Sequence, residues 1–321
     1  MILKVVGWIV AAFAIAWGSA HAQDYPTRDM KVIVGLPAGS GGDVNARFYA
    51  DQLSRLAGKP VIVENRPGMI LSIGADAVAK SPPDGYTILI TSVTSSHAAN
   101  LFNFKKLPYD PIKDFTPVAK LHQSYFVLVV RAEAQWKTVA ELTEAMRQKG
   151  EKSSYSYGSP PALASAELYK ARAGLKTVGI PYKTSVASLP EMFRGEIDFQ
   201  FLDSTTTVPL LNSGKLRGLA VTSAQRVPGL DLPTMAEAAG ISEFDVAPTW
   251  GVFLPAGAPA PVVAKLEAWF GEISKSEATK KFLANTHAAP AAGNARDLAA
   301  FIPKEIEKWR ELAKIAKIEP K

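Results

Sequence analysis

The chain has 321 residues, no cysteine, and 36 basic against 30 acidic side chains, for a formal charge of +6. Basic residues never occur more than two in a row and are interleaved with acids, which argues against the clustered patch of a nucleic-acid surface. Without cysteine the fold must be held by core packing, and this length suffices for two domains of ordinary size.

The first residues have the pattern of a secretory signal. Lys4 precedes an apolar run over 5–17, and Ala20, His21 and Ala22 have the small-x-small form of a signal peptidase site. The run is shorter than the roughly 20 residues that a membrane-spanning helix needs. We therefore expect cleavage after Ala22 and an exported mature protein, with an uncleaved anchor as the alternative.

Residues 31–57 are predicted to form a strand, a glycine-rich turn and a helix. A short aliphatic run at 32–34 precedes the turn at 37–42, and apolar residues then recur at helical spacing, with Asp43 as the expected N-cap. The first amides of a helix have no acceptor inside it, so such a turn can receive a carboxylate or phosphate. The alternative is a tight connection that needs glycine for steric reasons alone.

The rest of the chain alternates between the same two kinds of element. Strands are predicted at 61–64, 86–91, 126–130, 155–158, 177–181, 197–202, 216–222 and 250–254. Helices are predicted at 73–80, 139–148, 162–173, 185–194, 205–213, 260–273, 277–284 and 297–315. The prolines of 101–121 and of 227–249 predict irregular structure. This alternation indicates an α/β fold whose sheets are covered on both faces.

Two of these strands, 126–130 and 250–254, are interpreted as crossings between domains, because long stretches containing proline flank them. If both are hinges, residues 23–124 and 250–321 form one lobe, and residues 125–249 form the other. A ligand is then expected in the cleft between the lobes, as is common for sites at domain interfaces.

The turn at 38–42 superficially matches the nucleophile elbow of an α/β-hydrolase, with Ser40 as the nucleophile. Only about ten mature residues precede it, whereas that elbow lies on an interior strand. The candidate bases His97, His122 and His287 occur in no recognisable setting. An exported serine hydrolase using Ser40 is kept as the alternative to a binding protein.

Cofactor and metal motifs are not found in this sequence. The glycine-rich turn lacks the Gly-Lys-Ser/Thr of a P-loop, and Val44 stands where a dinucleotide fingerprint has its third glycine. The three histidines after residue 22 are scattered and the chain has no thiol, so no metal-ligand spacing is present. We therefore expect neither a cofactor nor a metal.

Small polar residues follow several predicted strands, at the ends where ligands of open α/β sheets bind. For each of them a helix cap is the alternative role. The candidate ligand-binding residues are Leu36, Pro37, Ala38, Gly39, Ser40, Gly41, Gly42, Ser92, Thr94, Ser95, Gly158, Ser159, Asp203 and Ser204.

Eight stretches, spread over nearly the whole chain after residue 22, are informative together: DYPTRDMKVIVGLPAGSGGDVNAR, VIVENRPG, IGADAVAKSPPDGYTILITS, NFKKLPYDPIKDFTPVA, IPYKTS, GEIDFQF, GKLRGLAVTS and WGVFLPAGAP. In this order they resemble the Bug family of periplasmic solute-binding receptors, which is associated with tripartite tricarboxylate transporters. The resemblance implies a two-lobed fold like that of type II periplasmic binding proteins, a periplasmic location and no catalysis. It also implies a small carboxylated solute in the cleft, held by amides, hydroxyls and water, with membrane transporter subunits as partners. We expect a monomer, and a receptor that serves only signalling is a further alternative.

Three departures from the family pattern all move toward apolar side chains. The first turn reads GLPAGSGGDV where the family usually has a sequence like PFAPGGSTDV. Met69, Ile70 and Leu71 follow ENRPG in place of alanine and glycines, and Leu163 stands where a histidine would align. These departures predict a ligand less polar than citrate or aspartate, such as an aromatic or aliphatic carboxylate.

Overall fold

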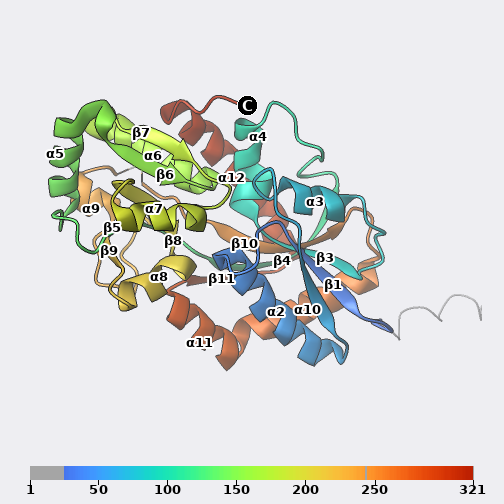
Figure 1. Cartoon of the computed structure of the whole chain (residues 1–321). Helices are drawn as coiled ribbons and strands as arrows, with labels where there is room; N and C mark the ends of the chain where they lie inside the picture. The colour runs from blue at the N-terminus through green and yellow to red at the C-terminus, as the bar shows by residue number, and fades with distance from the viewer. Residues whose placement is uncertain (1–24, 243, 321) are drawn as a thin grey trace, which may run out of the picture.

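The computed structural model describes residues 25–242 and 244–320, which form two β-sheets flanked by helices (Figure 1). The predicted signal sequence and its cleavage site lie outside the described residues. Within the described ranges no helix combines the length and the apolar character that crossing a bilayer requires.

The strands are β1 (Met30–Val34), β2 (Val61–Asn65), β3 (Thr87–Ser92), β4 (Phe115–Gln123), β5 (Phe126–Arg131), β6 (Ser154–Tyr157), β7 (Val178–Pro181), β8 (Phe199–Asp203), β9 (Leu216–Val221), β10 (Thr249–Pro255) and β11 (Ala289–Gly293). The α-helices are α2 (Gly41–Ala57), α3 (Ser72–Ala79), α4 (Asn100–Asn103), α5 (Val139–Lys149), α6 (Pro160–Ala173), α7 (Leu189–Arg194), α8 (Ser204–Asn212), α9 (Met235–Ala239), α10 (Ala260–Lys275), α11 (Glu277–Thr286) and α12 (Ala295–Ile315). A π-helix, η1 (Thr94–Ala99), and two short 3₁₀ segments, η2 (Gly150–Lys152) and η3 (Ser185–Ser188), complete the set.

The two sheets share one strand arrangement. The first has the order β11-β4-β10-β3-β1-β2 and the second the order β7-β6-β8-β5-β9. In the first sheet β1 lies parallel to β2 and β3, and in the second β6 lies parallel to β7 and β8. The next strand in each sheet, β10 or β5, is antiparallel. Parallel strands gather their carboxyl ends at one edge of a sheet, so each sheet offers one edge where three turns meet.

The chain passes between the sheets twice, immediately before β5 and immediately before β10. These are the two strands that the sequence predicts as crossings, and they hold the equivalent position in their sheets. The two connections are hydrogen-bonded to each other. Ser124 N in the first donates to Pro248 O in the second at 2.9 Å; within the second connection, Val246 N donates to Thr222 O at 3.0 Å.

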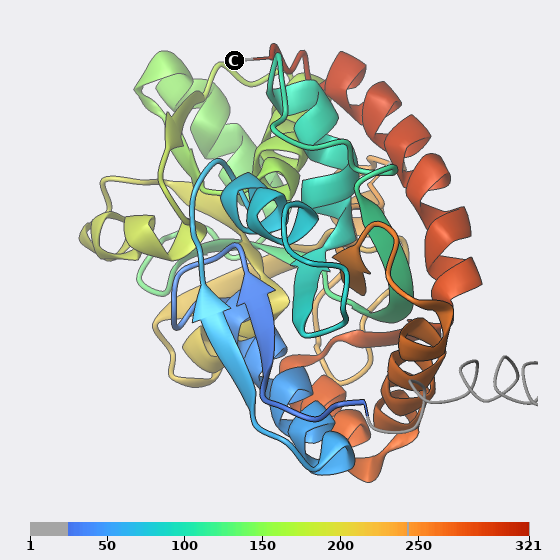
Figure 2. The same ribbon diagram turned by 90° about the vertical axis from the view of Figure 1, so that its right-hand side faces the viewer.

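Alternation along the strands divides the side chains between cores on the two faces. In β1, Val32 and Val34 pack toward α2 and α10, whereas Ile33 points into the opposite core. Burying an aliphatic side chain of this size stabilises the fold by about 1.5–3 kcal/mol. The core that holds Ile33 also contains Leu128 of β5 and Trp309 of α12, so it continues from one sheet to the other. Figure 2 shows α12, in red, along the outside of the molecule, where it contacts β4, η1 and α6.

Every predicted strand and helix overlaps an observed element, but the structure also contains elements that were not predicted, among them β4, β11 and α9. β4 begins at Phe115, near the end of the stretch 101–121 where prolines predict irregular structure, and it accommodates Pro117 opposite Phe253 of β10. β11 consists of alanine, proline and glycine and carries no strand signal of its own. α9 lies inside the stretch predicted to be loop-rich and is fixed by a capping box between Thr234 and Glu237.

Candidate functional site

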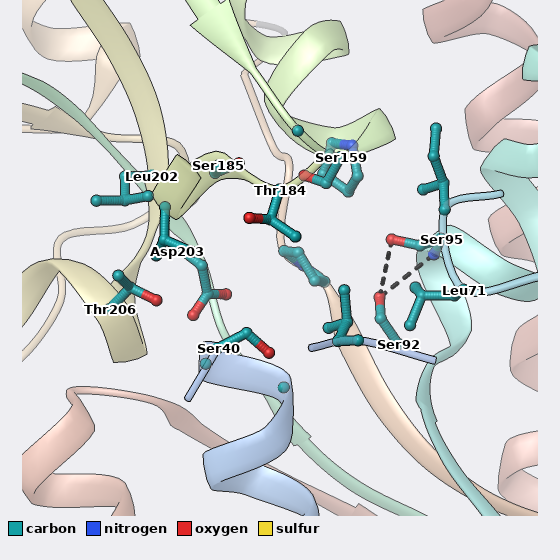
Figure 3. A pocket seen from close by; sticks show the side chains of 18 of the residues that line it. Ser40, Leu71, Ser92, Ser95, Ser159, Thr184, Ser185, Leu202, Asp203 and Thr206 are labelled. Atoms are coloured by element: carbon teal, nitrogen blue, oxygen red, sulfur yellow. Dashed lines mark hydrogen bonds between the residues drawn. The ribbon is translucent and has the colours of Figure 1, made fainter. Parts of the chain in front are cut away.

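A cavity of about 90 Å³ lies where the carboxyl-end turns of both sheets face each other (Figure 3). The structure brings nine of the fourteen predicted site residues to its wall. They are Leu36, Ser40, Gly41, Gly42, Ser92, Ser95, Gly158, Ser159 and Asp203. Segments far apart in the sequence therefore meet at one place, as expected if the two sheets face each other.

The first turn is capped differently from the prediction. Helix α2 begins at Gly41, and its N-cap is Ser40, whose Oγ accepts from Asp43 N at 3.3 Å and donates to Pro37 O at 2.7 Å. The prediction that Asp43 is the N-cap was wrong, because a serine three residues earlier supplies the acceptor that the helix start needs.

Asp43 instead holds the turn together from inside the helix. Its carboxylate accepts from Gly39 N at 2.9 Å, Arg47 Nε at 2.9 Å and Asn65 Nδ2 at 2.8 Å. Burial raises the pKa of this carboxyl, but the hydrogen bonds from Arg47, Gly39 and Asn65 outweigh it, so the pKa is below its usual value. The Gly39 amide is therefore already hydrogen-bonded and is not free to bind a ligand. At the cavity wall, α2 presents Gly41 and Gly42, whose amides have no acceptor within the helix.

The start of α6 offers fewer donors than expected. Ser159 is its N-cap and accepts from Ala162 N at 3.4 Å, but Pro160 and Pro161 fill the first two helical positions. Proline has no N–H, so these positions give the cavity an apolar ring, that of Pro161, and no amide. Gly158 has no room for a side chain, because an added Cβ would lie 2.1 Å from Ser185 N.

Asp203 is the one ionisable side chain among the described residues at the cavity wall. It caps α8 by accepting from Thr205 N at 3.0 Å, and it accepts from Ser124 Oγ at 2.8 Å. Burial raises the pKa of Asp203, against the lowering effect of these hydrogen bonds. A Cβ added at Gly41 would lie 3.0 Å from Asp203 Oδ1, so the start of α2 is in close contact with the start of α8 at the cavity wall.

Five predicted residues lie outside the cavity wall, namely Pro37, Ala38, Gly39, Thr94 and Ser204. Thr94 belongs to a buried network instead. Its Oγ1 donates to Glu305 Oε1 at 2.8 Å and accepts from Thr249 N at 3.1 Å, which ties α12 and β10 to η1. Ser204 is buried at the start of α8, where its amide donates to Tyr125 O at 2.8 Å.

Two turns that line the cavity were not among the predicted site residues. Ile70 and Leu71 come from the turn after β2, and Thr184, Ser185 and Val186 from the turn after β7. Both turns follow parallel strands. The search for small polar residues after strands would have found Thr184 and Ser185, but it passes over the apolar Ile70 and Leu71. The other missed residues are Phe126, Pro161, Leu202, Thr206, Pro248 and Trp250. Leu163, one of the apolar departures, packs against the core and is not at the wall.

The described residues do not assemble the hydrolase alternative. Ser40 bonds Pro37 and Asp43, while His97 pairs with Ser96 Oγ at 2.8 Å and His122 with Tyr49 OH at 3.0 Å. His287 contacts the Pro228 carbonyl oxygen. Within the described residues, three or more His, Asp or Glu side chains nowhere gather in a group that could hold a metal.

The comparisons with known proteins agree with this geometry. The family model described as "Tripartite tricarboxylate transporter family receptor" matches residues 45–318. The chain is 30% identical to Protein BugT of Bordetella pertussis over 311 residues, covering 96% of this chain and 95% of BugT.

Among solved structures, "R. palustris Rpa4515 with adipate" has a TM-score of 0.88 at 32% identity, with 93% of this chain and 100% of that chain covered. Periplasmic binding protein BugD has a TM-score of 0.86 at 28% identity, with 92% and 100% covered. MatC from Rhodopseudomonas palustris with bound malate has a TM-score of 0.82 at 27% identity, with 90% and 99% covered. The chain therefore belongs to the tripartite tricarboxylate transporter family of receptors, and has the two-lobed α/β fold of periplasmic binding proteins.

Proposed function

We propose that this protein is a periplasmic receptor that captures a small carboxylated organic solute and delivers it to a membrane transporter of the tripartite tricarboxylate type. The family assignment supports this, as do two related structures whose names include adipate and malate. In this proposal residues 23–124 and 250–321 form one lobe and residues 125–249 the other. The observation that carries the proposal is the cavity between the two sheets, because turns from both sheets line it.

The ligand's carboxylate is held by neutral donors. Gly41 and Gly42, with their free helix-start amides, are wall residues, and so are Ser92 and Ser95. Ser92 Oγ donates to Ser95 Oγ at 3.2 Å, which leaves the hydroxyl proton of Ser95 for the ligand. Interactions of a carboxylate with a helix start contribute about 0.3–2 kcal/mol each, so several must act together to reach the roughly −8 kcal/mol of micromolar binding. Ordered water that bridges to Thr184 and other hydroxyls would add contacts of similar enthalpy.

The rest of the ligand is apolar. No lysine, arginine or histidine is among the described residues of the wall, so a polyanion would lack a counter-charge there. Leu36, Ile70, Leu71, Phe126 and Trp250 supply hydrocarbon surface instead. This composition favours an aliphatic or aromatic carboxylate over citrate or aspartate, and it agrees with the apolar departures at 69–71.

Binding is coupled to closure of the two lobes about the paired connections before β5 and β10. The close contact of Gly41 with Asp203 and Thr206 supports the view that the described conformation is closed.

A thermal-shift panel with adipate, hexanoate, benzoate, malate, citrate and aspartate tests the proposal. A ligand at 100 times its Kd stabilises by about 2.7 kcal/mol, which raises the melting temperature by several degrees. We expect hexanoate or benzoate to give the largest shifts. The variant Ser92→Ala should bind about tenfold more weakly, whereas Ser223→Ala, whose exposed hydroxyl bonds Gln225 O, should bind normally. If only citrate, malate and aspartate stabilise the protein, the apolar part of the proposal is wrong; if no carboxylate does, the receptor proposal is wrong.

A further inference from the structure

The turn between β2 and α3 has an unusual backbone. Met69, Ile70 and Leu71 are three successive residues with φ of 40°, 48° and 72°, after Gly68 at 137°. In this left-handed region the Cβ of an L-residue approaches its own carbonyl oxygen, so residues other than glycine, asparagine and aspartate rarely occupy it. Ile70 is β-branched, which makes the conformation least favourable for it. Glycine would fit all three positions with less strain.

Close packing on the other side of the turn holds this conformation in place. A Cβ at Gly35 would lie 2.7 Å from Leu71 Cα, and a Cβ at Gly74 would lie 2.8 Å from Gly35 Cα. The Asn100 side chain then fastens the turn, since its Nδ2 donates to Ile70 O at 2.7 Å and to Ser72 Oγ at 3.0 Å. The surrounding structure therefore imposes the strained backbone, as is typical of functional sites.

The side chains show what the strained positions contribute. Ile70 and Leu71 both reach the cavity wall, and Figure 3 shows Leu71 beside Ser92 and Ser95. Met69 has the same backbone strain, but its side chain is 44% exposed and is not at the wall. Since the backbone itself would be satisfied by glycine, the two inner side chains are the distinctive contribution of this sequence.

We propose that Ile70 and Leu71 are specificity-determining residues that form the surface against which the hydrocarbon part of the ligand packs. The inference rests on the proposed function and narrows its ligand to carboxylates with several methylene groups or an aromatic ring. The protein accepts backbone strain at 69–71 and gains an apolar wall there. Replacing Ile70 with glycine should therefore raise the melting temperature and lower the preference for ligands with a long hydrocarbon part.

The test measures Kd for hexanoate and for succinate, together with melting temperatures without ligand. Ile70→Gly should bind hexanoate about tenfold more weakly, with succinate binding nearly unchanged, since contact with a few methylene groups is worth that much. Ile70→Asn, which tolerates the left-handed backbone, should change the ratio in the same direction. Two matched controls relieve strain away from the wall, Met69→Gly and Lys317→Gly, the latter at an exposed residue with φ of 49°. All three glycine variants should melt at or above the wild-type temperature, by roughly 1–3 °C.

Each outcome decides the inference. A fall in the hexanoate-to-succinate preference in both Ile70 variants, but in neither control, supports it. An unchanged preference in the Ile70 variants, an equal fall in Met69→Gly, or a wild type that binds succinate and not hexanoate overturns it while leaving a carboxylate receptor intact. If the wild type binds neither acid and none of the carboxylate panel, the proposed function fails and the inference fails with it.

Discussion

Ser124 Oγ donates a 2.8 Å hydrogen bond to Asp203 Oδ2, which joins the first connection between the lobes to the cap of α8 at the cavity wall. The same hydroxyl accepts from Trp250 Nε1 at 3.4 Å, and the Ser124 amide donates to Pro248 O in the second connection. Ser124, through its amide and its hydroxyl, therefore links both connections to Asp203, the acidic group among the described residues of the wall.

Replacing Ser124 with alanine should lower the free energy of unfolding by about 1–3 kcal/mol, because the half-buried Asp203 carboxylate loses a donor. Urea unfolding at pH 7 measures this. The matched control is Ser213→Ala, an exposed serine whose hydroxyl donates to Leu210 O, and its effect should stay within about 0.5 kcal/mol. Equal effects of the two substitutions would contradict a special role for Ser124.

Replacing Gly158 with alanine should disturb both folding and binding. The new Cβ would lie 2.1 Å from Ser185 N and from the carbonyl carbon of Thr184, so the turn after β7 must move away from the cavity. Overpacking of this kind costs about 1–3 kcal/mol. We also expect weaker ligand binding, because Thr184 and Ser185 are wall residues. Denaturation curves and ligand titration measure the two effects.

Gly271 is the matched control, since an added Cβ there meets nothing within 4 Å. It lies inside α10, so Gly271→Ala should stabilise the protein by about 0.5–1 kcal/mol and leave binding unchanged. A Gly158→Ala variant that behaves like Gly271→Ala would contradict this prediction, because it would show that the turn after β7 can move without loss of stability or binding.

Acid should destabilise the fold partly through His97. Its ring is fully buried, stacks on Phe253 with centroids 4.1 Å apart, and has a pKa that burial lowers to about 3. In the unfolded chain the pKa is near 6.5, so the unfolded state binds more protons as the pH falls. The stability that depends on neutral His97 is thus complete above pH 6.5 and is lost progressively between about 6.5 and 3.

The variant His97→Phe should therefore lose less stability than the wild type when the pH is lowered from 7.5 to 4. Urea unfolding at a series of pH values measures the difference between the two proteins. His122, whose pKa burial also lowers to about 3, remains in both proteins, so the slope should be reduced and not abolished. Parallel curves over this range would show that His97 is not the group that titrates.

Local patterns were enough to predict most of the framework. Alternation in 30–34 places Val32 and Val34 on one face of β1 and Ile33 on the other, and the buried strands at 87–92 and 126–131 are as apolar as predicted. Strands such as β4 and β11 escaped prediction because their pairing with neighbours far along the chain, and not their composition, makes them strands. The helix start at Gly41 was misplaced because Ser40 and Asp43 are both good caps locally.

The sequence by itself determined that the chain alternates strands and helices, that small residues follow the parallel strands, and that the turn at 69–71 is apolar. Those features depend on neighbours within one or two turns of the chain. Only the tertiary structure decided which turns face the cavity, because Leu36, Leu71, Ser185 and Trp250 meet through packing between segments up to about 200 residues apart. The tertiary structure also decided that Leu71 reaches the wall while Leu163 packs against the core, because the packing of whole helices and sheets sets where each side chain lies.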